Sequence, residues 1–303
     1  MRQQSNRLTR PAFPVRGPGA VMVAFLLLFL CLTAAPPPAA YANGPTTVYL
    51  PFQSTSVPKQ CLALSYVNQP GIFDTAVALG FNCWHTWTTY NYNQPGQYKF
   101  FHGLEVRHGA IYFPDWRSYL QQTLPSSFSG WLFVGNECDL PYPQCDLTPA
   151  ELAQVYEWIR AAFPNAKLVA PHPACPSAES VAKMPARYRH MPHCLDYTLA
   201  FLQLIDTPPD ATGVHCYTAT PTCPELARTF HEATGLPIFV SEWTVRQSWG
   251  NAAETTAAWL AALDATPYVL AHFYYAIVPD PWTDGLLTVD GGYTAQAQAF
   301  LAR

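Results

Sequence analysis

Short apolar runs alternate with amphipathic stretches along the chain from about residue 59 onward. The apolar runs are unbroken and bounded by turn residues, which is typical of buried strands, whereas the amphipathic stretches have helical spacing. Eight expected strands, most of them followed by an expected helix, span a length close to the roughly 250 residues of such folds, and they predict an α/β protein with a single (β/α)8 TIM barrel. The expected strands lie at 62–67, 81–87, 98–104 (with 110–113 as the alternative), 131–135, 167–170, 213–217, 237–240 and 269–277.

The expected helices alternate with these strands, and some carry clear end signals. Thr148, Pro149 and Glu151 form a capping box with proline at the first helical position, so a helix is expected to begin there. Gly235 is placed to end a later helix, because glycine readily adopts the left-handed conformation that closes a helix. The expected helices lie at 74–79, 115–124, 149–163, 197–205, 224–234, 252–263 and 295–302.

The first 58 residues do not continue this pattern. Several arginines precede an apolar run at 21–33, and Ala40-Tyr41-Ala42 is a small-residue cleavage site, so residues 1–42 are interpreted as a signal peptide. Residues 43–58 are Pro-rich and are expected to form a linker or arm, which leaves 59–303 as the folded domain. The apolar run is shorter than the roughly 20 residues that a membrane span needs, which favours secretion; retention as an anchor stays the alternative.

Composition narrows the class of partner. Only 12% of the residues are charged and the net charge is −4, which does not fit a nucleic-acid surface. The 30 prolines and 14% aromatic residues favour a compact exported domain with long loops. We therefore expect a secreted monomer with no nucleic-acid partner and no membrane contact after signal cleavage, with cell-surface association left open.

Cysteine usage agrees with export. Of nine cysteines, Cys31 falls in the leader, and the even number that remains favours disulfides. A zinc site is the alternative, but the chain has no C-x-x-C motif. Spacing favours three local pairs and leaves a fourth by elimination, although eight cysteines allow about 105 pairings. The expected pairs are Cys138–Cys145, Cys175–Cys194, Cys216–Cys223 and Cys61–Cys83.

Two glutamates carry the candidate chemistry. The apolar run 131–135 leads directly into Asn136 and Glu137, and the run 237–240 leads into Ser241 and Glu242. The carboxyl ends of parallel strands are where barrel enzymes place their reactive groups. An Asn-Glu pair alone occurs by chance, so the weight comes from this position. Two glutamates, each at a strand end, supply what a glycosidase needs: one carboxyl group as acid and one as base or nucleophile.

Other polar and aromatic residues fall near the same strand ends. His215 and Tyr217 alternate on one expected strand, so both side chains point to one side. If that side is the barrel mouth, both can reach a carboxylate on the next strand; a structural histidine and a packed tyrosine are the alternative. Aromatic rings offer flat faces to sugars, with core packing as the alternative. His172, His193 and His272 lack metal-ligand spacing and are expected to be structural, so no metal or cofactor is expected. The candidate substrate-binding residues are Asn136, His215, Tyr217, Trp84, His85, Trp87, Trp243, Tyr274 and Tyr275.

These residues carry a family resemblance. VGNECD at 134–139, GVHCY at 213–217, PIFVSEW at 237–243 and HFYY at 272–275 resemble the clan A retaining glycoside hydrolases. Within the clan the chain is most similar to the small single-domain group of endo-β-1,3-glucanases and alkali-sensitive-linkage (asl1-like) wall proteins. The resemblance implies Glu137 as acid/base, Asn136 as a ligand of the sugar 2-hydroxyl and Glu242 as nucleophile. Cys138 departs from the group's usual proline, and no barrel arginine that supports the nucleophile can be placed.

The sequence therefore predicts a secreted retaining β-glycosidase over 59–303 that cleaves a polysaccharide, with endo-β-1,3-glucanase activity expected. A barrel that binds carbohydrate without catalysis is one alternative. A clan A enzyme acting on another β-glycan, such as xylan or mannan, is another. A metal-dependent hydrolase using His85, His172 and His215 is a further rival, which a chelator would test.

Overall fold

A computed structural model describes residues 59–64, 71–89, 99–104, 116–141, 144–184, 193–280 and 283–303. The predicted signal peptide, the Pro-rich arm, the end of the first expected strand and the alternative strand at 110–113 lie outside these residues. None of the helices in the described ranges is long and apolar enough to cross a membrane.

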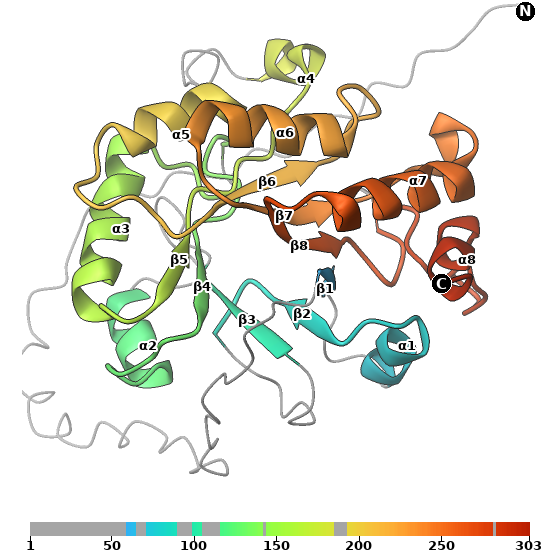
Figure 1. The fold of residues 1–303 in the computed structure, drawn as a ribbon, viewed down its shortest axis with the longest axis horizontal. Helices are drawn as coiled ribbons and strands as arrows, with labels where there is room; N and C mark the ends of the chain where they lie inside the picture. The colour runs from blue at the N-terminus through green and yellow to red at the C-terminus, as the bar shows by residue number, and fades with distance from the viewer. Residues whose placement is uncertain are drawn as a thin grey trace, which may run out of the picture. The chain divides into compact units, whose positions relative to one another are not determined.

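Eight parallel strands form the centre of the fold (Figure 1). They are β1 (Gln60–Ala63), β2 (Cys83–His85), β3 (Lys99–Leu104), β4 (Trp131–Val134), β5 (Lys167–Val169), β6 (Thr212–Cys216), β7 (Ile238–Trp243) and β8 (Val269–Tyr274). Their order is β5-β4-β3-β2-β1-β8-β7-β6. The end strands meet through a bridge between Val169 and Ala211, and the Gly213 N–H donates to the Pro171 carbonyl at 2.9 Å. The sheet therefore closes on itself, and the predicted barrel is confirmed.

Helices follow most of the strands and cover the outside of the barrel (Figure 1). The predicted capping box is present, since the Thr148 N–H donates to Glu151 at 2.8 Å, and Gly235 ends its helix at φ 70°. The short α4 and the 3-10 helix η1 (Gln247–Trp249) were not predicted. The α-helices are α1 (Ile72–Ala78), α2 (Trp116–Thr123), α3 (Pro149–Ala162), α4 (Ala178–Lys183), α5 (Cys194–Leu202), α6 (Cys223–Thr234), α7 (Ala252–Ala265) and α8 (Ala295–Leu301).

Apolar side chains form two kinds of layer. Inside the barrel, Phe133, Phe239 and Phe273 pack around one another with ring centroids 5.3 to 6.3 Å apart. Outside it, a second layer fills the space between strands and helices, as with Trp243, which packs on Trp259 of α7. The inner layer fills the barrel, so only its rim is left for chemistry.

Four disulfides join the expected pairs, the three that spacing predicted and the fourth that elimination left. Cys61–Cys83 links neighbouring strands β1 and β2, whereas the other three close loops that follow β4, β5 and β6. The loop that carries Glu137 is closed by Cys138–Cys145. Covalent links therefore limit how far this loop can open without unfolding.

Candidate active site

A bulge in β7 decides where Glu242 points. Val240 pairs with Val214, yet Glu242 pairs with the next residue, His215, so Ser241 is an extra residue in the ladder. Phe239 belongs to the inner layer and Val240 to the outer one. Regular alternation would then place Glu242 outside the barrel. The extra residue shifts this register and turns the Glu242 carboxylate toward the barrel interior.

Glu137 is held at the end of β4 by an unusual backbone. Gly135 and Glu137 have φ of 73° and 52°, and the left-handed region costs a non-glycine residue about 1 kcal/mol. The Glu137 N–H donates to the His172 carbonyl at 2.9 Å, which helps to hold that conformation. Strain of this kind is found where a side chain must be aimed. Glu137 is 8% exposed and lies at the barrel rim.

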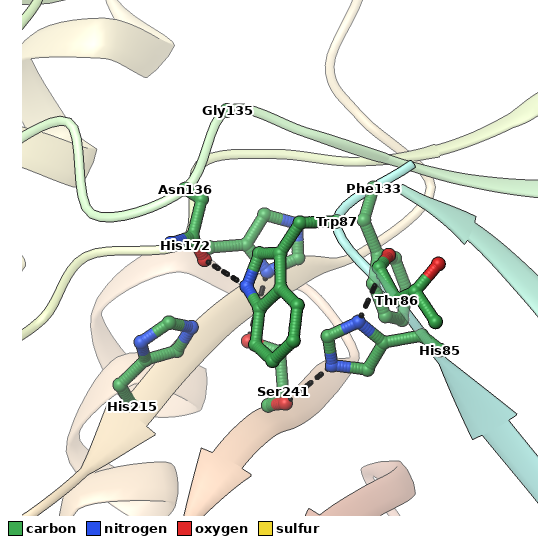
Figure 2. A pocket seen from close by; sticks show the side chains of 9 residues that line it. All are labelled: His85, Thr86, Trp87, Phe133, Gly135, Asn136, His172, His215 and Ser241. Atoms are coloured by element: carbon green, nitrogen blue, oxygen red, sulfur yellow. Dashed lines mark hydrogen bonds between the residues drawn. The ribbon is translucent and has the colours of Figure 1, made fainter. Parts of the chain in front are cut away.

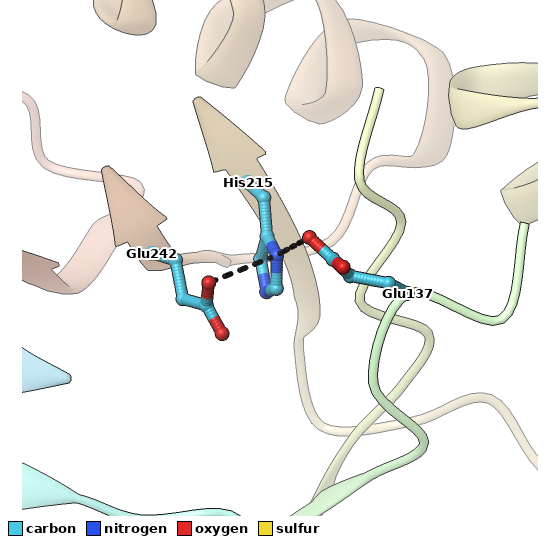
Figure 3. Close-up of side chains that lie close together, drawn as sticks. All are labelled: Glu137, His215 and Glu242. Atoms are coloured by element: carbon cyan, nitrogen blue, oxygen red, sulfur yellow. Dashed lines mark hydrogen bonds and ion pairs between the residues drawn. The ribbon is translucent and has the colours of Figure 1, made fainter. Parts of the chain in front are cut away.

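The two glutamates meet at His215 (Figure 3). Its Nδ1 lies 2.9 Å from Glu137 Oε1 and 3.5 Å from Glu242 Oε2. One oxygen of each carboxylate and this ring lie within 4.8 Å of one another. Glu242 also accepts hydrogen bonds from Trp87 Nε1, at 3.0 Å, and from the Tyr217 hydroxyl. The structure therefore brings together both predicted glutamates and three of the predicted neighbours.

Burial and charge set the protonation of this cluster. Burial raises the pKa of Glu242 to about 7; the negative charge of Glu137 adds to the rise, while His215 and the hydrogen bonds to Glu242 oppose it. Burial acts to lower the pKa of His215, but the carboxylates of Glu242 and Glu137 outweigh it and raise that pKa. Close carboxylates resist ionising together, so the cluster holds protons that isolated side chains would release.

This pKa predicts a pH-dependent gain in stability for Glu242→Gln. Between the ordinary value of 4.5 and about 7, the folded carboxyl keeps a proton that the unfolded chain releases, so wild-type stability falls as pH rises. The glutamine does not titrate. The variant's advantage in free energy of unfolding should therefore grow from near zero at pH 4.5 to about 1–3 kcal/mol at pH 8, as measured by urea unfolding. A surface control, Glu254→Gln, should show no such trend, and a flat difference for Glu242→Gln would contradict the expectation.

A small pocket is lined in part by His215, the residue that contacts both glutamates (Figure 2). Its walls include Asn136, whose side-chain oxygen accepts from Trp87 Nε1 at 3.2 Å. The pocket is also lined by His85, His172 and Ser241, none of which is more than 3% exposed. These polar groups therefore line the pocket next to His215.

Some predicted binding residues line the mouth of the site and others do not. Trp87 and Tyr275 are half-buried with ring centroids 5.8 Å apart, and Tyr217 lies 6.1 Å from Tyr275. Trp84, Trp243 and Tyr274 are instead at most 1% exposed and pack in the outer layer between strands and helices. The prediction that they bind sugar is therefore wrong, because alternation along their strands turns these rings away from the barrel mouth.

His85 and His172 are both buried and both contact Ser241. His85, predicted to bind substrate, lines the pocket, but its Nε2 donates to the Ser241 carbonyl at 2.8 Å and its ring packs on Phe133 and Phe273. Burial lowers the pKa of His85 to about 4, so the ring is neutral. His172, expected to be a scattered structural residue, reaches the hydroxyl of Ser241 at 2.9 Å. Sequence reasoning missed Ser241 and His172, and only the apolar strand before Ser241 hinted at the position.

Among the described residues, one group has the composition to hold a divalent metal: Glu137, His215 and Glu242. Carboxylate and imidazole are ligands that zinc and manganese accept. The direct contacts of His215 with both carboxylates also account for the cluster through hydrogen bonding. Activity in the presence of a chelator separates these two roles.

Comparison with known proteins gives a family and a fold. Residues 67–300 match the family model described as the glycosyl hydrolase catalytic core. No curated protein is similar enough to match the chain.

Solved structures share the barrel at low sequence identity. A GH128 (subgroup II) endo-β-1,3-glucanase from Sorangium cellulosum has a TM-score of 0.63 and 18% identity, over 81% of this chain and 98% of that one. A curdlan-specific GH128 (subgroup III) exo-β-1,3-glucanase from Blastomyces gilchristii, in complex with glucose, has a TM-score of 0.60 and 15% identity, over 81% of this chain and 98% of that one. A GH128 (subgroup VII) oligosaccharide-binding protein from Trichoderma gamsii has a TM-score of 0.58 and 16% identity, over 82% of this chain and 94% of that one.

Proposed function

The chain belongs to the glycosyl hydrolase catalytic core family, and from that premise we propose that it is a secreted retaining β-glycosidase acting on β-1,3-glucan. The observation that carries the proposal is the pair of buried glutamates at the ends of β4 and β7, with carboxylate oxygens within 4.8 Å. Retaining enzymes hold their carboxyl groups about 5–5.5 Å apart, whereas inverting enzymes need about 6.5–9.5 Å to admit a water. The short separation supports retention.

The contacts of each glutamate support its role. Glu242 takes hydrogen bonds from Trp87 and Tyr217, donors that stabilise a carboxylate, and its ionised form is available from about pH 7 upward. Its oxygen attacks the anomeric carbon while Glu137 gives a proton to the leaving glycosidic oxygen. Glu137 then takes a proton from water, which attacks the glycosyl–enzyme and releases Glu242. No step needs an organic cofactor.

Aromatic residues at the site and the activities of similar structures support the proposed substrate class. Trp87 lines the pocket and contacts Tyr275, which in turn contacts Tyr217. All three aromatic residues are half-buried, and Tyr275 is held by a 2.5 Å hydrogen bond to Asp280. Such rings stack on the C–H face of glucose units. Similar structures include β-1,3-glucanases of both endo and exo action, and we propose endo action on this polymer. Four disulfides support export to an oxidising compartment.

Product analysis tests the reaction. The secreted protein should cleave laminarin into oligosaccharides and release them first in the β-configuration, as seen by proton NMR within the first minutes. Lichenan, xylan, mannan and chitin serve as the comparison panel. Activity should survive a chelator, since the proposed steps use no metal. Release of the α-anomer would refute retention, and cleavage of xylan or mannan alone would refute the substrate.

A binding protein without catalysis is the competing function, because one structure of the same fold is an oligosaccharide-binding protein. An activated fluoro-laminaribioside with a dinitrophenyl leaving group separates the two. A working nucleophile becomes labelled once per chain, at the peptide that holds Glu242, whereas a binding protein stays unlabelled. The presence of both glutamates favours the enzyme.

A further inference from the structure

The ring of His172 holds the bulge that aims Glu242. Its Nε2 lies 2.9 Å from the Val169 carbonyl, which can only accept, so Nε2 carries the ring proton. The other nitrogen, Nδ1, then accepts the hydroxyl proton of Ser241 at 2.9 Å. Burial and the nearby charge of His215 lower the pKa of His172 well below its ordinary value, which keeps the ring neutral. Ser241 is the extra residue of β7, directly before Glu242.

The backbone of the same residue holds the other glutamate. The carbonyl of His172 accepts the N–H of Glu137 at 2.9 Å, where the left-handed backbone needs support. Space for the ring depends on Gly213, because a Cβ at that position would lie 2.0 Å from His172 Nδ1. His172 is itself 3% exposed, so neither contact competes with bulk water. One residue after β5 therefore contacts the strand ends of both β4 and β7.

We propose that His172 is a positioning residue that sets the separation and direction of both glutamates, through its ring to Ser241 and its carbonyl to Glu137. This inference depends on the proposed function, in which the two carboxylates act on one glycosidic bond. Misplacement of reacting groups by about 1 Å can cost about 100-fold in rate. Substitution of the His172 ring removes its hydrogen bond with Ser241, so the position of the nucleophile Glu242 is affected before that of Glu137.

The test compares His172→Gln with Ser241→Ala and with a matched control, His272→Gln. His272 is also a fully buried histidine, but its ring bonds to Asp264 at 3.0 Å. The measured quantity is the rate of covalent trapping by the activated fluoro-laminaribioside, expressed per folded molecule. This rate reports nucleophilic attack alone. We expect a fall of about 10–100-fold for His172→Gln, a smaller fall for Ser241→Ala, and less than additive loss in the double variant.

The control separates positioning from folding. His272→Gln should lower the melting temperature yet leave the trapping rate per folded molecule unchanged, whereas Ser241→Ala keeps the test open if His172→Gln does not fold. The inference is overturned if His172→Gln and Ser241→Ala trap at the wild-type rate. Crystal structures of these two variants should show the Glu242 carboxylate displaced relative to Glu137, and an unchanged pair would also overturn it. Failure of the wild type to trap would refute the proposed function, while the crystal structures would still decide the positioning.

Discussion

Glu242→Ala is expected to abolish turnover on every substrate, with kcat lowered on the order of 10⁶-fold or to background. In the proposed mechanism this carboxylate forms the covalent bond that displaces the leaving group, so a better leaving group cannot replace it. Laminarin hydrolysis and release of dinitrophenol from an activated laminaribioside should both be lost. Substrate binding should survive, and can be measured by calorimetry with laminari-oligosaccharides.

A matched comparison guards against a general loss of structure. Glu254→Ala changes an exposed glutamate of α7 and should retain full activity. If Glu242→Ala kept substantial activity on the activated glycoside, Glu242 would not be the nucleophile. If all turnover were lost but binding were also lost, the variant would be misfolded, and circular dichroism would show it.

Glu137→Ala is expected to depend on the leaving group. Hydrolysis of laminarin, whose sugar leaving group needs a proton, should fall on the order of 10³–10⁴-fold, within the range of general acid catalysis. An activated aryl glycoside should lose far less in its first step, because dinitrophenolate leaves without a proton. The glycosyl–enzyme should then accumulate, since no base activates water.

Azide should partly rescue this variant. The small anion can enter the space left by the carboxyl group and attack the glycosyl–enzyme without a base, and the product should be the β-glycosyl azide. NMR of the product reads its configuration directly. An α-azide would mean that the two glutamates have exchanged roles or that the mechanism is not retaining, and equal loss on both substrates would exclude Glu137 as the acid.

Much of the architecture was readable in the sequence. Short apolar runs bounded by turn residues predicted the strands, and the Thr148 box and Gly235 predicted helix ends, because these signals act over a few residues. Three disulfides followed from the loops that they close, and the fourth, Cys61–Cys83, followed by elimination. Glu137 and Glu242 could be selected since each follows an apolar strand directly, and the barrel's geometry brings such strand ends to one rim.

The orientation of the site depended on the tertiary structure. Alternation counted along β7 sends Glu242 outward, and only pairing with β6 and β8 creates the extra residue at Ser241 that turns it inward. The orientation of each strand in the closed sheet likewise places Trp84, Trp243 and Tyr274 in the outer layer, which residue type alone does not reveal. The proposed role of His172 also depends on tertiary structure, because its hydrogen-bond partners lie in or directly after three different strands, β4, β5 and β7. Local composition determined the elements and the candidate chemistry, whereas register between strands that are distant in sequence decided which side chains meet.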